Sequence, residues 1–494
     1  MALSATPLSK SRYLSGLQCQ KRLYWEVHRR DLLPTEVAPS QQAVFDAGNE
    51  VGELARRRHP GGVLIEADHF HHREAVEATK LAMADPAVPA IFEAAFTHDG
   101  IKIRADILIR NADGTWDMQE VKATTSVKEV HLPDLAVQVY VLEGCGIKIR
   151  RAGILHLDRD YVLGERGLDL SALFRSTEVS ALLPPHLSAV AANVPAFRTV
   201  LDQPAEPAIS AGDQCYSPYE CPFTHICVLP QGPYDLGQIP RGAKVVAAMA
   251  ALGVDDVRNV PAGTTMSSLQ MRVVTSVASG KEYVGTGLRA ALESVAFPLL
   301  FLDFETFAPA IPRYVGTRVY QALPTQWSLH TLDRDGGLTH AEHLHNADTD
   351  PRLAFAESLL DVLGRKGSIV VYSSYEATQI RALAFAIPSQ SAALLGLLPR
   401  FVDLLTIVRA HYYHPAFGGS FSIKSVLPAL VPKLAYDDLA VQDGSTAAVL
   451  YGRMVNPGTS AEEAAGIREA LLRYCERDTL AMVEVREALL ARCP

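Results

Sequence analysis

The stretch Phe301-Leu302-Asp303-Phe304-Glu305-Thr306 places two acids, two positions apart, in an apolar run that begins at Pro298. Side chains alternate between the faces of a strand, so Asp303 and Glu305 are predicted to share one face of a buried strand. Two like charges side by side on a core strand are costly, and a divalent cation is the usual compensation. The stretch therefore predicts either a metal site or a strand end with solvated acids.

Two later segments carry acids in a similar setting. Residues 368–372 are predicted to form a second apolar strand, and Glu376 follows at the start of a helix. Tyr474 and Asp478 lie four positions apart in a long helical pattern that begins near Ala461. With this set the chain resembles the DnaQ-like (DEDD) exonucleases of the RNase H-like fold. That family has an Asp-x-Glu strand, a second acid after a later strand, and a C-terminal Tyr-x-x-x-Asp helix motif.

The resemblance to the DEDD exonucleases implies roles for individual residues. Tyr474 would orient the attacking water. Four acids would bind Mg²⁺ or Mn²⁺, namely Asp303, Glu305, Glu376 and Asp478. Glu376 departs from the family, which usually has Asp at that position. Lys424, at the start of a predicted helix, would either meet a phosphate or lie solvated.

The first third of the chain alternates helices and strands in another order. Strands are predicted over 90–97, 101–110 and 115–123, with turns between them. A helix over 132–143 and a strand over 151–157 follow. This order predicts a mixed sheet whose last strand is reached through a helix.

Charged residues on these elements form a second candidate site. Glu120 and Lys122 share a face of the third strand, and Asp106 lies on the second strand. Two acids can hold Mg²⁺ or Mn²⁺, and a lysine can polarise the scissile phosphate or orient the water. With Gln138 on the next helix, the set resembles the PD-(D/E)xK nucleases of the RecB type. The resemblance implies Asp106 and Glu120 as metal ligands and Lys122 and Gln138 as catalytic residues. The alternative is charged residues on an ordinary sheet.

The chain departs from the RecB-type pattern at two places. Many relatives place a metal-binding histidine on the first helix, where this chain has Glu50 and Glu53. The family's Gln-x-x-x-Tyr pair is replaced by Gln138-Val139-Tyr140, so only Gln138 is carried over.

Three cysteines stand at equal spacing after this region. Cys215, Cys221 and Cys227 are separated by five residues each, and Pro222 directly follows the second, a pattern typical of thiolate ligands in a loop. The set resembles the iron-staple (AddB-like) nucleases, which hold a [4Fe–4S] cluster with one early and three late cysteines. The resemblance implies Cys19 as the fourth ligand. The alternatives are a zinc site, in which His225 could replace a cysteine, and buried thiols without a metal.

Composition narrows the class of protein. The chain has 494 residues, of which 48% are hydrophobic and 20% charged, as in a folded protein of two or three domains. The apolar run 245–252 is too short to span a bilayer, and residues 1–12 lack the apolar segment of a signal peptide. A cytoplasmic protein without membrane contact or structural disulfides is therefore predicted. The net charge of −9 argues against binding of nucleic acid by bulk charge alone.

Together these features predict a mixed α/β fold (α+β mixed sheets) in three domains. Residues 1–232 would form a restriction-endonuclease-like PD-(D/E)xK core with the cysteine cluster. Residues 233–292 would form a helical connector that resembles a helix-hairpin-helix. Residues 293–494 would form an RNase H-like exonuclease domain.

The expected function is that of a metal-dependent nuclease, a DNA exonuclease in end processing, repair or defence against foreign DNA. The expected partners of such a nuclease are nucleic acid and the other proteins of a repair or defence complex. This expectation rests on the usual functions of the fold and not on the chemistry of particular residues. Two alternatives stay open. One is a nucleic-acid-binding protein with one or both modules degenerate, and the other is a nuclease directed at RNA.

Overall fold

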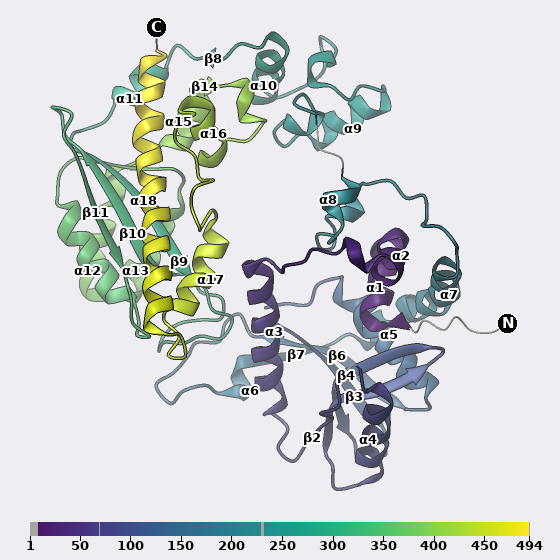
Figure 1. Ribbon diagram of the computed structural model, residues 1–494. Helices are drawn as coiled ribbons and strands as arrows, with labels where there is room; N and C mark the ends of the chain where they lie inside the picture. The colour runs from purple at the N-terminus through teal and green to yellow at the C-terminus, as the bar shows by residue number, and fades with distance from the viewer. Residues whose placement is uncertain (1–7, 69, 229–231, 494) are drawn as a thin grey trace. The chain divides into compact units, whose positions relative to one another are not determined.

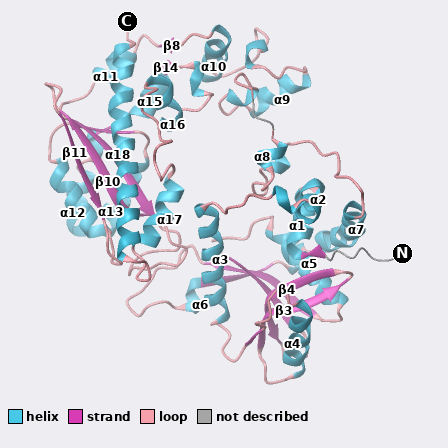
Figure 2. Cartoon of the chain, in the orientation of Figure 1, coloured by secondary structure: helices cyan, strands magenta, loops and turns pink. Residues whose placement is uncertain are grey.

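The computed structural model describes residues 8–68, 70–228 and 232–493 (Figure 1). Helices and mixed β-sheets alternate along the chain, which confirms the predicted α/β fold class (Figure 2). Among the described residues, no single helix is long and apolar enough to cross a membrane.

The chain divides into two compact units. The first comprises Met1–Leu229 and Pro309–Tyr320, and the second comprises Pro230–Ala308 and Gln321–Pro494. Residues 233–292, predicted to be a separate connector, belong to the second unit and share its largest hydrophobic core. The physical reason is that short helices bury their apolar side chains only against another element.

The first unit is built on one mixed sheet with the order β2-β3-β4-β5-β6-β7, and β1 pairs with β4. Neighbouring strands are antiparallel except for the β1–β4, β2–β3 and β5–β6 pairs, which are parallel. The strands are β1 (Leu8–Ser9), β2 (Val63–Leu64), β3 (Ala90–His98), β4 (Ile101–Arg110), β5 (Trp116–Lys122), β6 (Ile149–Leu157) and β7 (Phe174–Glu178). The predicted strands agree with β3, β4, β5 and β6 to within two residues.

Two hydrophobic cores lie in contact with this sheet. One is shared with α1, α4, α5 and α7, and the other with α3. The helices are α1 (Lys10–Gln18), α2 (Gln20–His28), α3 (Pro39–Arg56), α4 (His72–Ala84), α5 (His131–Gly144), α6 (Leu170–Leu173), α7 (Pro184–Leu201) and α8 (Thr224–Cys227). The predicted helix over 132–143 is therefore confirmed as α5.

The second unit contains a five-stranded sheet with the order β11-β10-β9-β12-β13. The β9–β10 and β10–β11 pairs are antiparallel, and the β9–β12 and β12–β13 pairs are parallel. The strands are β9 (Leu299–Phe307), β10 (Leu323–Leu332), β11 (Leu338–Leu344), β12 (Ser368–Val371) and β13 (Phe401–Asp403). A further small ribbon pairs β8 (Tyr283–Val284) with β14 (Tyr412–Tyr413).

Strand β9 follows the predicted alternation. Leu300, Leu302 and Phe304 pack in one core with α12 and α13, whereas Leu299 and Phe301 pack in the core that includes α18. Asp303 and Glu305 continue this second set, so they point toward the α18 side of the sheet.

The helices of the second unit cover both faces of this sheet. They are α9 (Ala243–Ala251), α10 (Ser268–Ser279), α11 (Leu288–Glu293), α12 (Arg352–Leu363), α13 (Tyr375–Ala386), α14 (Ser391–Leu395), α15 (Leu404–His411), α16 (Ile423–Leu430), α17 (Gly444–Met454) and α18 (Ala461–Ala491). The long C-terminal helix predicted from Ala461 is confirmed as α18, which contacts β9 and β10.

Candidate functional sites

The two acids of β9 meet a third acid from α18. Carboxylate oxygens of Asp303, Glu305 and Asp478 all lie within 4.8 Å of one another. Glu376, in the first turn of α13, lines the same cleft and is 4% exposed. Its Oε2 atom is buried and has no hydrogen-bond partner among the described residues. The structure thus brings the four acids around one cleft, three of them close enough to share an ion.

The electrostatics of this acid cluster are unfavourable without a cation. Burial, followed by repulsion from Asp478, raises the pKa of Glu305 to about 8. Burial raises the pKa of Glu376 to about 7 and that of Asp478 to about 6. For Asp303, burial and repulsion from the neighbouring acids raise the pKa well above its usual value. Each acid thus resists ionisation until an opposite charge arrives.

Tyr474 lies beside these acids, one turn before Asp478 on α18. Lys424 Nζ donates a hydrogen bond to Tyr474 Oη at 3.0 Å, and Lys424 lines the cleft. Tyr436 Oη donates to Asp478 Oδ1 at 2.5 Å. The sequence pointed to Tyr474 and Lys424 but missed Tyr436, which lies in a segment without a recognisable pattern.

The acid cluster opens into a cleft of about 1190 Å³. Its lining includes the loop 418–422, where Gly418 and Gly419 adopt φ values of 59° and 81°. A Cβ at Gly419 would lie 2.0 Å from the carbonyl oxygen of Gln238, so glycine permits the close approach of residues from the predicted connector. Arg241, also from that segment, lines the cleft as well.

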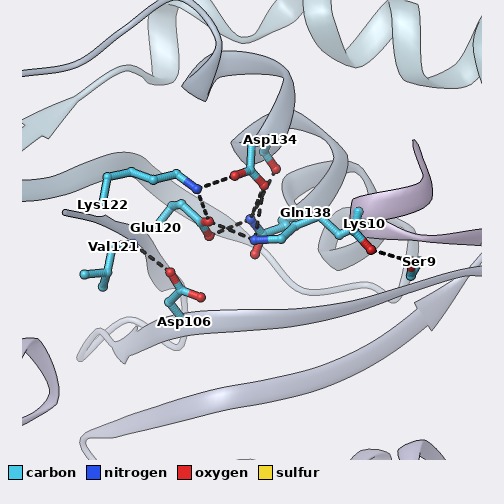
Figure 3. A network of polar contacts seen from close by, with 9 residues as sticks. Ser9, Lys10, Asp106, Glu120, Val121, Lys122, Asp134 and Gln138 are labelled. Carbon is cyan, nitrogen blue, oxygen red and sulfur yellow. Dashed lines mark hydrogen bonds and ion pairs between the residues drawn. The ribbon is translucent and has the colours of Figure 1, made fainter. Parts of the chain in front are cut away.

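In the first unit the predicted residues gather around Glu120, which is 2% exposed (Figure 3). Lys122 Nζ donates to Glu120 Oε1 at 2.8 Å, and Gln138 Nε2 donates to Glu120 Oε2 at 2.6 Å. Lys10 Nζ also donates to Glu120 Oε1 at 2.8 Å. Asp134 accepts from both lysines (Figure 3).

The lysines reverse the effect of burial on Glu120. Burial alone would raise the pKa of Glu120, but the charges of Lys10 and Lys122 hold it well below its usual value. The acids act in return on Lys122: burial lowers its pKa, and the attraction of Glu120 and Asp134 outweighs burial and raises it. The carboxylate of Glu120 therefore stays ionised although it is buried.

Asp106 lies next to this network, and Val121 N donates to its Oδ2 at 2.8 Å. Burial and the charge of Glu120 raise the pKa of Asp106 well above its usual value. Asp106 also lines a cleft of about 640 Å³ with Glu50, Glu53 and Glu93. Glu93 has a φ of 55°, and neither it nor Asp106 pairs in the β3–β4 ladder, although the residues on both sides do. The ladder is thus distorted at the predicted metal ligand.

Two members of the Glu120 network were missed by the sequence analysis. Lys10 is 110 positions from Glu120, so no local pattern connects the two residues. Asp134 lies one turn before Gln138 on α5, a spacing that could have indicated a shared face. Tyr140 takes no part, because its hydroxyl donates to Asp99 instead.

Cys19, Cys215, Cys221 and Cys227 line one small pocket, with Trp25 and Phe223. Cys19 lies between α1 and α2 as an extended residue (φ −163°, ψ 121°). Cys221 N donates to Cys215 O at 2.8 Å and closes the loop between them. No three of these four sulfur atoms lie within 4.8 Å of one another. His225 is exposed and is not among the lining residues.

A comparison with protein-family models gives a partial match. Residues 300–422, about a quarter of the chain, match the model of a domain of unknown function, DUF2779. The matched segment contains Asp303, Glu305 and Glu376 and ends before Lys424 and Asp478. No curated protein matches the chain.

Proposed function

We propose that the protein is a metal-dependent nuclease that hydrolyses phosphodiester bonds of DNA from an end. The observation that carries this proposal is the triad of Asp303, Glu305 and Asp478, whose oxygens lie within 4.8 Å of one another and which line an open cleft. Carboxylate oxygens are the preferred ligands of Mg²⁺ and Mn²⁺, and a bound cation would offset the repulsion and burial that raise the pKa values of these acids.

The residues present fit a divalent cation. The buried Oε2 of Glu376, without a hydrogen-bond partner among the described residues, offers a further ligand beside the triad. A bound Mg²⁺ or Mn²⁺ would supply charge for the attacking and leaving oxygens. Tyr474, held by Lys424, would orient the attacking water by its hydroxyl. Lys424 would also bring positive charge to the phosphate.

The order of strands supports the same proposal. Three antiparallel strands followed by two parallel ones, in the order β11-β10-β9-β12-β13, is the arrangement expected for an RNase H-like domain. The acids come from its central strand β9 and from α13 and α18, as the DEDD resemblance implies.

The first unit supports a second nuclease site of the PD-(D/E)xK type. Asp106 and Glu120 would hold a metal ion, Lys122 would meet the phosphate, and Gln138 would fix the Glu120 carboxylate. The four cysteines that line one pocket would bind the [4Fe–4S] cluster. Four thiolates also form common zinc sites, so a zinc ion bound by the same cysteines is the alternative.

One observation favours an alternative for the first unit. Both oxygens of Glu120 are engaged, one by two ammonium groups and the other by an amide. A carboxylate so fully satisfied has little capacity left for a metal ion, as expected if the first unit binds nucleic acid without cutting it.

Digestion of end-labelled DNA and RNA, single- and double-stranded, in Mn²⁺ tests these assignments. We expect the wild-type protein to release nucleotides from DNA and Asp303→Ala to abolish that release. If Lys122→Ala abolishes a different cleavage, both units are nucleases. If Lys122→Ala changes only binding, the first unit is a binding module. Tight binding by the wild-type protein without any cleavage would contradict the nuclease proposal.

A further inference from the structure

Helix α1 joins two features of the first unit. Its first residue, Lys10, lies in the Glu120 network, and Cys19, directly after its last residue, lines the cysteine pocket. Nine helical residues span only about 13.5 Å at 1.5 Å per residue. A helix of this length is expected to behave as a rigid body, so a displacement of Cys19 would also displace Lys10.

At the Lys10 end, four charges alternate. Lys10 Nζ lies 2.8 Å from Glu120 Oε1 and 3.1 Å from Asp134 Oδ1, and Lys122 forms ion pairs with the same two acids (Figure 3). The two ammonium groups therefore balance the two carboxylates. Asp106, next to them, adds one further acid.

At the Cys19 end, α1 is fastened to the loop that carries the late cysteines. Gln18 Nε2 donates to the carbonyl oxygens of Gln214 and Tyr219, both at 2.7 Å. Trp25 on α2 packs against Phe223 with ring centroids 5.2 Å apart. A ligand or contact that orders the cysteine loop would therefore also order the C-terminal end of α1.

We infer that Lys10 is a positioning residue of the first-unit site and that α1 is the element through which the cysteine pocket holds it in place. This inference rests on the nuclease function proposed for that site. With Lys10 present, Glu120 and Asp134 share two ammonium groups, and Lys122 keeps an N–H donor for a phosphate. Without Lys10, Lys122 alone has to neutralise both acids and is held away from the substrate.

The first test replaces Lys10 in an Asp303→Asn background, which removes the second-unit site from the readout. We expect Lys10→Met to lower the rate of Mn²⁺-dependent cleavage about tenfold or more, while Mn²⁺ affinity, measured by calorimetry, is unchanged or higher because the site becomes more negative. Lys10→Arg should restore most of the rate. The matched control is Lys80→Met, which removes an exposed lysine paired with Glu77 on α4.

Two outcomes would overturn the role of Lys10. One is a parallel loss of cleavage and Mn²⁺ affinity without rescue by Lys10→Arg, which indicates a merely structural residue. The other is unchanged cleavage in Lys10→Met while Lys122→Met is inactive. If Lys122→Met and Asp106→Asn both cleave normally in the same background, the proposed nuclease site itself is wrong.

The second test measures the link to the cysteine pocket by amide hydrogen exchange, which does not depend on activity. Cys227→Ala lies outside α1, and we expect it to speed exchange over 10–18 at least tenfold while β4 and β5 stay protected. Cys145→Ala, which removes an exposed cysteine outside the pocket, should have no such effect. If Cys227→Ala unfolds the unit, Gln18→Ala removes the two fastening hydrogen bonds instead. Unchanged exchange of α1 in both variants would overturn the link.

Discussion

The two acidic sites of this protein compensate their carboxylates in opposite ways. In the first unit, Glu120 is paired with Lys10 and Lys122 from its own chain. In the second, Asp303, Glu305 and Asp478 form no ion pair with a lysine or arginine of the described residues. The pKa of Glu120 is accordingly lowered, and those of the second-unit acids are raised.

The site without lysine partners depends more on its surroundings than the site that has them. A buried carboxylate that has ammonium partners from its own chain is ionised in the folded protein without a bound cation. A group of buried carboxylates without such partners is stable only when protonated or when a cation is bound. The second-unit site should therefore respond strongly to metal and pH, and the first-unit site mainly to substitution of its lysines.

The largest effect should come from removing an acid of the triad. Asp303→Asn is expected to lower Mn²⁺-dependent release of nucleotides about a thousandfold, because the ion loses a central ligand. End-labelled single-stranded DNA is the substrate, and release is followed over time. Asp333→Asn, in the exposed turn between β10 and β11, is the matched control and should cleave normally. Full activity of Asp303→Asn would show that the triad is not a metal centre.

Neutralising one acid should have opposite effects on the stability of the two units. Without metal at pH 8, Glu120→Gln is expected to lower the free energy of unfolding of the first unit by about 3 kcal/mol, because two partly buried ammonium groups each lose one of their two carboxylate partners. Glu305→Gln should raise that of the second unit by on the order of 1 kcal/mol, because a repelling charge is removed. Scanning calorimetry measures both. A change of the free energy of unfolding in the same direction in both variants would contradict the comparison between the two sites.

The dependence on pH should also separate the units. Because their folded pKa values exceed the unfolded ones, the second-unit acids contribute stability that is fully present below about pH 4 and is lost as the pH rises from there through about 6 to 8. A bound Mn²⁺ ion would compensate the ionised second-unit acids in place of protons. The increase in the Tm of the second unit on adding Mn²⁺ should therefore be larger at pH 8 than at pH 6. Glu120 has a lowered pKa, so its contribution is present above the unfolded value and is lost only in acid. Thermal scans with and without Mn²⁺ test this; an equal Tm shift at both pH values would count against it.

The smallest effect concerns the tyrosine on α18. Tyr474→Phe keeps the ring and removes the hydroxyl that accepts from Lys424, so we expect cleavage to fall about tenfold with little change in Tm. Tyr283→Phe, on the small β8–β14 ribbon, serves as the control. An unaltered rate in Tyr474→Phe would remove this hydroxyl from the proposed mechanism and leave the triad assignment intact.

Local patterns in the sequence predicted most of the elements that carry the sites. The alternation in β9 placed Asp303 and Glu305 on one face, and the helical pattern from Ala461 placed Tyr474 and Asp478 one turn apart. The order of strands and helix in the first unit placed Glu120, Lys122 and Gln138 together. Each of these inferences needs only the periodicity of a single element or of neighbours.

The boundaries of the units could not be predicted in this way. Residues 233–292 carry short helical patterns that fit a free-standing connector, yet their apolar side chains belong to the core that includes α18. Which core a short helix joins depends on the apolar faces left uncovered elsewhere in the fold, and no local pattern contains that information.

The strand or helix on which each acid lies could be predicted from the order of residues, because side-chain direction follows from backbone periodicity. The charged and polar groups that compensate these acids are known from the folded structure alone. Lys10 reaches Glu120 across 110 positions, Tyr436 reaches Asp478 across 42, and no comparable lysine forms an ion pair with the β9 acids among the described residues. Electrostatic partners are chosen by distance in space, which the order of residues does not specify.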